Sequence, residues 1–171
     1  MSPDLDSLAE RARASATRPV VLIDGRSGAG KTTLAQGLAP LLDAQLVSLD
    51  DVYPGWDGLE AGSAAVAGML GHEDPGYVRW DWAAAREAGR HPLDPGRALV
   101  VEGCGAISRA SRSLASLAIW VDAPEDERRR RALARDPGFA PYWDHWAAQE
   151  LEHLAREDPP ALADLILSTP S

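Results

Sequence analysis

The sequence contains no asparagine and only one cysteine, and each shortage excludes a class of protein. Among 171 residues the lone Cys104 excludes an internal disulfide framework and favours a reducing, cytoplasmic location. Without asparagine there is no Asn-Lys-x-Asp segment, with which GTP-driven switches, by analogy, read guanine. No apolar run approaches membrane-spanning length, and the acidic segment Met1–Asp6 is not an export signal. We therefore expect a cytoplasmic protein with no membrane partner.

Positive charge is scarce as well. The net charge is −9 at pH 7, and the only dense basic run is residues 128–131. Because nucleic-acid binding depends on positive charge spread over a surface, we expect no nucleic-acid partner. Length and a 45% apolar content predict a single domain over residues 1–171. The protein is expected to be a monomer or a homodimer, and the sequence leaves both open.

The one lysine lies inside a glycine-rich motif, while the other sixteen basic residues are arginines. Residues 25–32 match the nucleotide-binding pattern G-x-x-x-x-G-K-[ST]; segment 19–24 predicts a buried strand before them, and 32–42 a helix after them. Such a loop aims N–H groups at phosphates, and the helix N-terminus adds positive potential. We expect Thr32 to offer its hydroxyl to Mg²⁺ and the loop to hold the β- and γ-phosphates of a triphosphate through Gly25, Arg26, Ser27, Gly28, Ala29, Gly30, Lys31, Thr32 and Thr33.

Strands alternate with helices along the rest of the chain. Further strands are expected at 45–49, 98–102, 117–121 and 164–167, and helices at 5–18, 80–87 and 125–135. Another helix presents one apolar stripe with Trp143, Trp146, Ala147, Leu151 and Leu154, and its two tryptophans are assigned to the core. This order predicts an α/β P-loop NTPase fold with a mainly parallel sheet of about five strands, helices on both faces, and ligands at the strands' carboxyl ends. The Gly- and Pro-rich stretch 52–78 is interpreted as a mobile substrate flap.

Carboxylates stand at the ends of several strands of this predicted sheet. Asp50 and Asp51 follow the second strand, and we favour Asp50 as the general base, with Asp51 equally explained as a cap on the next turn. Glu102 ends an otherwise apolar strand, where an uncompensated carboxylate is costly unless it faces a metal or its waters. Its rival as the metal-side carboxylate is Asp122, which is more simply explained as supporting a helix start at Pro124.

Arginines and aromatic residues supply the remaining candidates. Arg128, Arg131 and Arg135 share one helical face in the region 124–142, an arginine-bearing lid that can clamp a transferring phosphate; the alternative is a solvated run paired with the acidic residues at 125–127. Four aromatic residues in or beside the flap can enclose an acceptor or serve ordinary packing: Tyr53, Tyr77, Trp80 and Trp82.

Taken together, these segments resemble the uridine kinase branch of P-loop kinases. Residues 25–33 look like its phosphate loop, Val47–Tyr53 is similar to its I-S-Q-D-S-F-Y segment, and Val101–Gly103 to its glutamate–glycine pair. The resemblance implies that Asp50 is the base, Glu102 a metal-site residue, and residues 126–136 an arginine-bearing lid. It also implies that Asp81, within the segment that begins at Arg79, holds substrate hydroxyls.

The chain also departs from that family. Residues 137–141 carry no charge where uridine kinases continue with an Arg-Gly-Arg element, so the lid is expected to be trimmed. We expect an ATP- and Mg²⁺-dependent kinase acting on a hydroxyl of a small metabolite, such as a nucleoside or a polyol. The alternative is an ATPase or a nucleotide-binding regulatory module without an acceptor.

Overall fold

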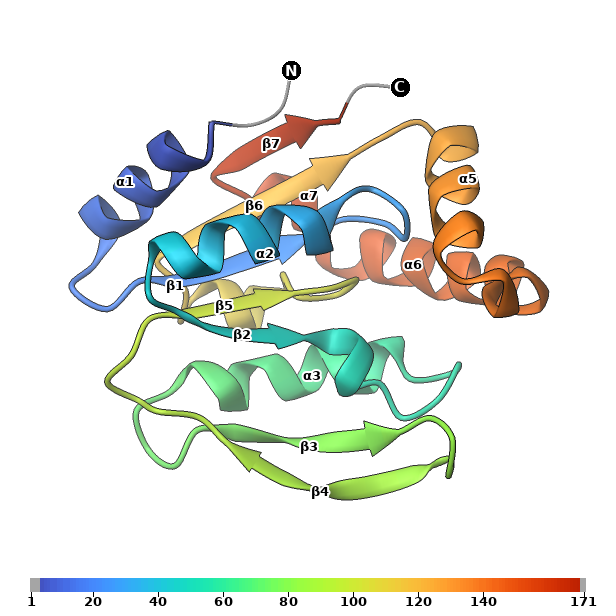
Figure 1. Cartoon of the computed structure of the whole chain (residues 1–171), viewed down its shortest axis with the longest axis horizontal. Coiled ribbons are helices and arrows are strands. Elements are labelled where there is room, and N and C mark those ends of the chain that lie inside the picture. Colours follow the sequence, from blue (N-terminus) through green and yellow to red (C-terminus); the bar gives the residue numbers. More distant parts are fainter. Residues whose placement is uncertain (1–3, 170–171) are drawn as a thin grey trace.

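The apolar segments form five strands of one parallel sheet, in the spatial order β2-β5-β1-β6-β7 (Figure 1). The structure is a computed structural model that describes residues 4–169. The strands are β1 (Val20–Asp24), β2 (Gln45–Ser48), β5 (Leu99–Glu102), β6 (Leu117–Asp122) and β7 (Leu165–Ser168). Strands β1 and β5 are buried throughout, as expected for the centre of a parallel sheet.

Helices cover both faces of this sheet. Because strand side chains alternate, Val21 and Ile23 of β1 join one apolar core with α1 and α2, whereas Leu22 joins a second core with α3 and α6. The α-helices are α1 (Leu5–Ser15), α2 (Lys31–Leu41), α3 (Leu59–Leu70), α4 (Arg109–Arg112), α5 (Glu125–Arg135), α6 (Trp143–Glu157) and α7 (Pro159–Leu162). Two 3-10 helices, η1 (Leu49–Asp51) and η2 (Pro137–Tyr142), complete the helical elements of residues 4–169. The predicted α/β fold class is confirmed.

The strand register brings the candidate residues to one edge. Ile23 of β1 and Ser48 of β2 both pair with Glu102 of β5, so these three strands end level with one another. The loop after β1, the turn that holds Asp50 after β2, and Glu102 therefore meet at the carboxyl edge of the sheet, where ligands bind in folds of this kind.

The predicted helix at 80–87 is wrong. Residues 76–92 instead form an antiparallel hairpin of β3 (Gly76–Asp81) and β4 (Arg86–Pro92), separate from the central sheet. Asp81 accepts a hydrogen bond from the Ala84 amide (2.9 Å), and Ala85 takes a positive φ of 50°, which turns the chain back on itself. Strand pairing across the turn outweighs the helix propensity of the alanine run.

The buried face of α6 also differs from the predicted stripe. Trp143 and Trp146 are buried in the core as expected, but Leu151 is 55% exposed. The residues that complete the buried face are polar, Glu150 and His153. Both lie beneath the loop after β1, where Glu150 contacts Ser27 and His153 lies near Asp24.

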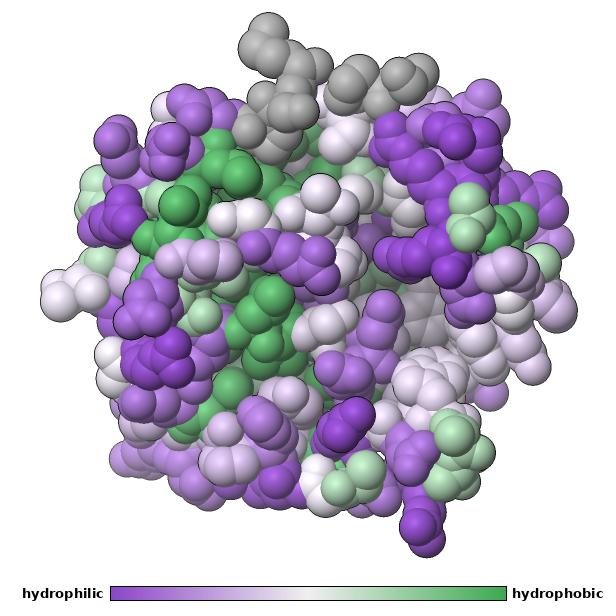
Figure 2. Space-filling model, viewed as in Figure 1, coloured by the Kyte–Doolittle hydropathy of each residue, from purple (hydrophilic) through white to green (hydrophobic). Residues whose placement is uncertain are grey.

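The surface of the face shown in Figure 2 is mostly hydrophilic, and apolar residues come to the surface between the polar ones. Among residues 4–169 the most exposed large apolar side chains are Ile166 and Leu151. Within residues 4–169, no helix combines the length and the apolar character needed to span a bilayer.

Candidate active site

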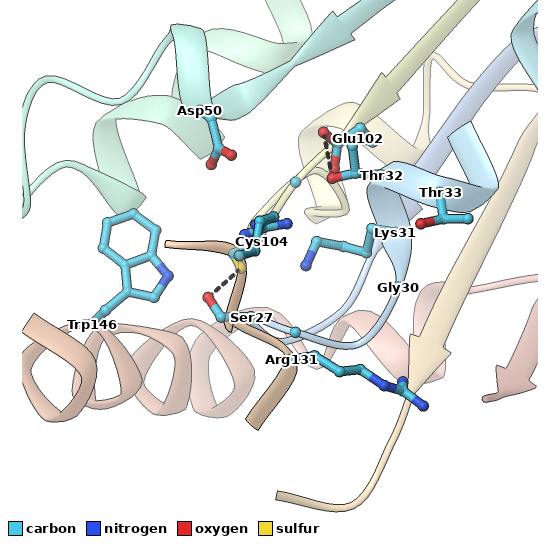
Figure 3. A pocket seen from close by; sticks show the side chains of 13 residues that line it. Ser27, Gly30, Lys31, Thr32, Thr33, Asp50, Glu102, Cys104, Arg131 and Trp146 are labelled. Atoms are coloured by element: carbon cyan, nitrogen blue, oxygen red, sulfur yellow. Dashed lines mark hydrogen bonds between the residues drawn. The ribbon is translucent and has the colours of Figure 1, made fainter. Parts of the chain in front are cut away.

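The glycine-rich loop joins β1 to α2 and curls around the side chain of its lysine. The Lys31 ammonium donates a hydrogen bond to the main-chain oxygen of Arg26 (3.1 Å) and points into an open cavity (Figure 3). Gly28 has a φ of +81°, and a Cβ atom there would lie 2.0 Å from the main-chain oxygen of Arg128 in α5. Only glycine therefore lets α5 lie against the loop in this shape.

The cavity has a volume of about 270 Å³ and opens beside the N-terminus of α2. Its lining combines parts of the loop with groups from four other elements and their connections: Ser27, Gly28, Gly30, Lys31, Thr32, Thr33, Asp50, Glu102, Gly103, Cys104, Arg131, Arg135 and Trp146. Main-chain N–H groups at a helix N-terminus and a lysine ammonium form an anion-binding site. The cavity can therefore hold the phosphates of a nucleotide.

Two charged groups in the cavity influence each other. Burial raises the pKa of the Glu102 carboxyl above its usual value, although the nearby Lys31 ammonium opposes the shift. For Lys31, burial alone lowers the pKa, but at the alkaline pH where the lysine titrates the charges of Cys104, Glu102, Glu150 and Asp24 outweigh this effect, so the pKa lies above its ordinary value. The lysine is therefore charged at neutral pH and available to an anionic ligand.

Thr32 and Glu102 supply oxygen ligands beside this lysine. The Thr32 hydroxyl donates a hydrogen bond to the Glu102 carboxylate (3.2 Å), and both side chains line the cavity (Figure 3). Within residues 4–169 no cluster of three or more His, Cys, Asp or Glu side chains could hold a metal alone. A hydroxyl and one carboxylate fit Mg²⁺, which keeps several waters and shares its remaining positions with substrate phosphates. The rival, Asp122, is exposed and accepts a hydrogen bond from the Ala123 amide (3.0 Å), outside the cavity.

A second chamber, of about 330 Å³, adjoins the first and shares Ser27, Asp50, Arg135 and Trp146 with it. Its remaining lining is Tyr53, Trp56, Trp82, Asp136 and Phe139. Asp50 lies on the boundary, with its carboxylate directed toward the cavity in Figure 3. The indole N–H of Trp82 donates to the main-chain oxygen of Asp50 (2.7 Å), so the β3–β4 hairpin is tied to the turn that carries this aspartate. A molecule in this chamber can place a hydroxyl between Asp50 and the phosphate cavity.

The arginines of α5 divide into two groups. Arg131 and Arg135 line the phosphate cavity. Arg131 also donates to Glu127 (2.7 Å) and to the Thr169 hydroxyl (3.0 Å). Arg128 is buried outside the cavity and donates to the main-chain oxygens of Ala123 (3.1 Å) and Ser27 (3.3 Å). Arg128, which was predicted to contact the nucleotide, therefore braces the loop from behind and does not line the cavity.

A layer of buried acidic residues beneath the loop was not identified from the sequence. Glu150 of α6 accepts hydrogen bonds from the Ser27 amide (2.7 Å) and the Arg26 guanidinium (2.8 Å). Cys104 lies against the same carboxylate (3.4 Å), and burial raises the pKa of its thiol to about 12. Arg26 therefore points to α6 and holds the loop in place, and the thiol stays protonated at neutral pH.

Asp24 forms the second half of this layer. It ends β1 and accepts hydrogen bonds from the amides of Gly25 (2.6 Å), Gly105 (3.0 Å) and Ile107 (2.9 Å). His153 of α6 lies 3.9 Å from the Asp24 carboxylate and donates to the main-chain oxygen of Ile107 (3.0 Å). Burial raises the pKa of Asp24 to about 6, against the opposing effects of the Ile107 amide, His153, the Gly25 amide and Lys31. The sequence signal was a carboxylate at the end of a wholly apolar strand, the signal that selected Glu102.

Of the residues predicted to bind the substrate, only some line the second chamber. Tyr53 lines the second chamber and donates through its hydroxyl to the main-chain oxygen of Cys104 (2.6 Å). Arg79 and Asp81 lie on β3 and line neither cavity; the Asp81 carboxylate caps the hairpin turn. The aromatic lining residues that sequence reasoning did not assign to the chamber are Trp56, Phe139 and Trp146.

No protein-family model matches the chain. Among curated proteins, a tRNA dimethylallyltransferase from Chlamydia pneumoniae is 34% identical over 61 residues, which amount to 36% of this chain and 18% of that protein. The chain thus spans less than a fifth of that relative's length.

Solved structures resemble the chain over nearly its whole length. A protein from Bacillus stearothermophilus, described as a possible uridine kinase, superposes with a TM-score of 0.65 at 21% identity and covers 95% of this chain and 96% of its own. Shikimate kinase from Acinetobacter baumannii, in complex with shikimate, has a TM-score of 0.54 at 21% identity and covers 94% and 88%. The chain therefore has the fold of P-loop kinases, which confirms the fold that the sequence resemblance implied.

Proposed function

We propose that this protein, with its P-loop kinase fold, is an ATP-dependent kinase that transfers the γ-phosphoryl group to a hydroxyl of a small metabolite. The observation that carries the proposal is the pair of adjoining cavities that share Asp50. One has the loop amides, Lys31 and Thr32 that suit a triphosphate, and the other has walls that suit a small organic molecule. An ATPase needs only the first cavity.

The residues divide the work of phosphoryl transfer between them. The loop amides and Lys31 hold the β- and γ-phosphates of ATP, while Arg131 and Arg135 neutralise charge on the migrating group. Thr32 and Glu102 would hold Mg²⁺, which supplies further neutralisation of the phosphate oxygens. Glu150, Asp24 and Arg128 support the loop from outside the cavity.

Asp50 serves as the general base. The acceptor hydroxyl oxygen forms a bond to the γ-phosphorus, and the bond from that phosphorus to the β–γ bridging oxygen breaks. The bonding electrons leave with ADP, and the hydroxyl proton passes to the Asp50 carboxylate and then to solvent. The products are ADP and a phosphate monoester of the acceptor.

The acceptor is a small molecule rather than a nucleic acid. The matched tRNA dimethylallyltransferase acts on tRNA by its description, but this chain has a net charge of −9 and lacks the distributed positive charge that a polyanion needs. A chamber of about 330 Å³ has the size of a metabolite site.

The proposal is tested by ADP release from Mg·ATP with and without a panel of hydroxyl metabolites. We expect release to rise with an acceptor, and Asp50→Asn to lower acceptor-dependent turnover by about 100-fold or more. The matched control is Asp51→Asn, because Asp51 is exposed and lines neither cavity. Full turnover by Asp50→Asn would show that Asp50 is not the base. Release that no compound stimulates would favour the ATPase.

A further inference from the structure

The second chamber, which is the proposed acceptor site and is called the acceptor chamber below, is lined mainly by aromatic residues. Five of its nine lining residues carry rings, and of the remaining four two are carboxylates. The rings come from separate elements: Tyr53 and Trp56 from the segment before α3, Trp82 from the hairpin turn, Phe139 from η2 and Trp146 from α6. Segments far apart in the sequence therefore build the chamber together, and the arrangement of their aromatic rings limits the shape of the molecule that fits.

The rings either stack directly on one another or meet at steep angles, and they form no open slot. Trp56 already stacks on Tyr142 (4.4 Å between centroids, 7° between planes) and on Phe139 (5.2 Å, 14°), so neither pair leaves a gap for another flat ring. Trp82 is inclined at 57° to Trp56, and Trp146 at 83°. Ring planes inclined in this way form a corner, which suits a rounded group better than a planar one.

Charge in the chamber favours a cation. Asp50 and Asp136 both line it, and the Asp136 carboxylate is held in place by the Gly138 amide (3.0 Å). The only basic lining residue is Arg135, which also lines the phosphate cavity and therefore lies on the side of the migrating phosphoryl group. An acceptor with a carboxylate or phosphate of its own would face two like charges, whereas a cation would face two carboxylates and aromatic rings.

We propose that the acceptor is a cationic alcohol, an amino alcohol or a quaternary ammonium alcohol, whose charged group lies against the ring corner while its hydroxyl reaches Asp50. The inference rests on the proposed kinase activity and identifies the class of its acceptor. Aromatic cages recognise ammonium groups because the ring face carries partial negative charge. The two carboxylates add to that attraction.

The test compares alcohols in pairs that differ only in charge. Choline is paired with 3,3-dimethylbutan-1-ol, and piperidin-4-ylmethanol with cyclohexylmethanol; uridine represents a planar acceptor. We measure kcat/KM for acceptor-dependent ADP release and identify the phosphate ester by mass spectrometry. The cationic member of at least one pair is expected to exceed its neutral partner by about 2- to 30-fold, the range that cation–π attraction supplies.

Three variants of the hairpin locate the recognition. Trp82 is 40% exposed, so its replacement leaves the core packed. Trp82→Leu removes one ring of the corner and is expected to lower the ratio of cationic to neutral alcohol, because the other rings and the two carboxylates remain. Trp82→Phe keeps a ring but loses the hydrogen bond from the indole N–H to the main-chain oxygen of Asp50. It is expected to retain most of the preference for the cationic alcohol. Trp80→Leu is the matched control on the same hairpin, since Trp80 lines neither cavity, and the ratio should stay at the wild-type value.

Failure of the inference and failure of the kinase proposal give different results. Equal kcat/KM within both pairs, or uridine as the best acceptor, would overturn the cationic class while leaving a kinase. A preference for the cation that survives Trp82→Leu unchanged would overturn the role of the ring corner. If neither these alcohols nor any neutral hydroxyl metabolite stimulated ADP release, the proposed function itself would fall, and the inference with it.

Discussion

Replacement of Glu150 tests whether α6 holds the phosphate loop in its binding shape. The carboxylate is buried and is hydrogen-bonded to the Ser27 amide and the Arg26 guanidinium. Glu150→Ala leaves a buried N–H without an acceptor, which costs about 1–3 kcal/mol, and breaks an ion pair, which costs about 3–5 kcal/mol when both partners are fully buried. Because the Arg26 side chain is 20% exposed, water recovers part of this loss, and we expect a total of about 3 kcal/mol.

Glu150→Gln separates the two contributions. The amide keeps an oxygen that can accept from Ser27 but loses the charge that faces Arg26. We expect it to lower the free energy of unfolding by about 1–2 kcal/mol, less than Glu150→Ala. Urea unfolding measures both variants, with Glu152→Ala as the matched control because that side chain on the same helix is exposed, so its effect should stay within about 0.5 kcal/mol.

Binding of Mg·ATP distinguishes a role in the loop from a role in stability alone. If the loop of Glu150→Ala adopts its binding shape only about a tenth of the time, calorimetry will give a Kd about tenfold weaker than that of the wild type. Glu152→Ala should bind as tightly as the wild type. If Glu150→Ala matched Glu152→Ala in both ATP affinity and unfolding, α6 would not position the loop.

Two other predictions follow from the burial of the loop and its surroundings. Because folding raises the pKa of Asp24 from 3.8 to about 6, ionisation of this carboxyl destabilises the native state as the pH rises from about 4 to 7. Over that range the free energy of unfolding of Asp24→Asn, measured with urea, should rise by about 3 kcal/mol relative to that of the wild type. A difference between the two proteins that does not change with pH would contradict the raised pKa. Gly28→Ala should destabilise the protein by about 3 kcal/mol or more, because the added Cβ atom has no room and the residue has a positive φ. Gly68→Ala in α3 is the control: the space around Gly68 is open, so the added methyl group should stabilise the helix by about 0.5–1 kcal/mol. Equal effects of the two variants in thermal unfolding would contradict the geometry of the loop.

The sheet and the phosphate loop could be predicted because their signals are local. Apolar runs gave the five strands, and the motif around Lys31 gave the loop between β1 and α2. The hairpin at 76–92 could not, because its stability comes from pairing between β3 and β4 and from a turn at Ala85, while the alanine run around it favours a helix locally. Non-local pairing is not visible in a short window of sequence.

The site was predictable where a carboxylate followed a strand. Asp50 and Glu102 were selected by that pattern and both line the phosphate cavity. Glu150 carried no such signal, because a glutamate on an amphipathic helix is ordinarily solvated, and only its contact with a loop far away in sequence keeps it buried. The same contact explains why α6 turns Glu150 rather than Leu151 inward.

The most direct test that the loop and Lys31 bind ATP is a calorimetric titration of Mg·ATP into the wild type and into Lys31→Ala. The structure places the Lys31 ammonium in the cavity among the loop amides, where it would contact the terminal phosphates. We predict saturable binding to the wild type with one site per chain, and at least about tenfold weaker binding to Lys31→Ala, since a hydrogen bond to a charged group contributes about 1.5–3 kcal/mol. Absence of binding to the wild type, or equal affinity in both proteins, would contradict the claim.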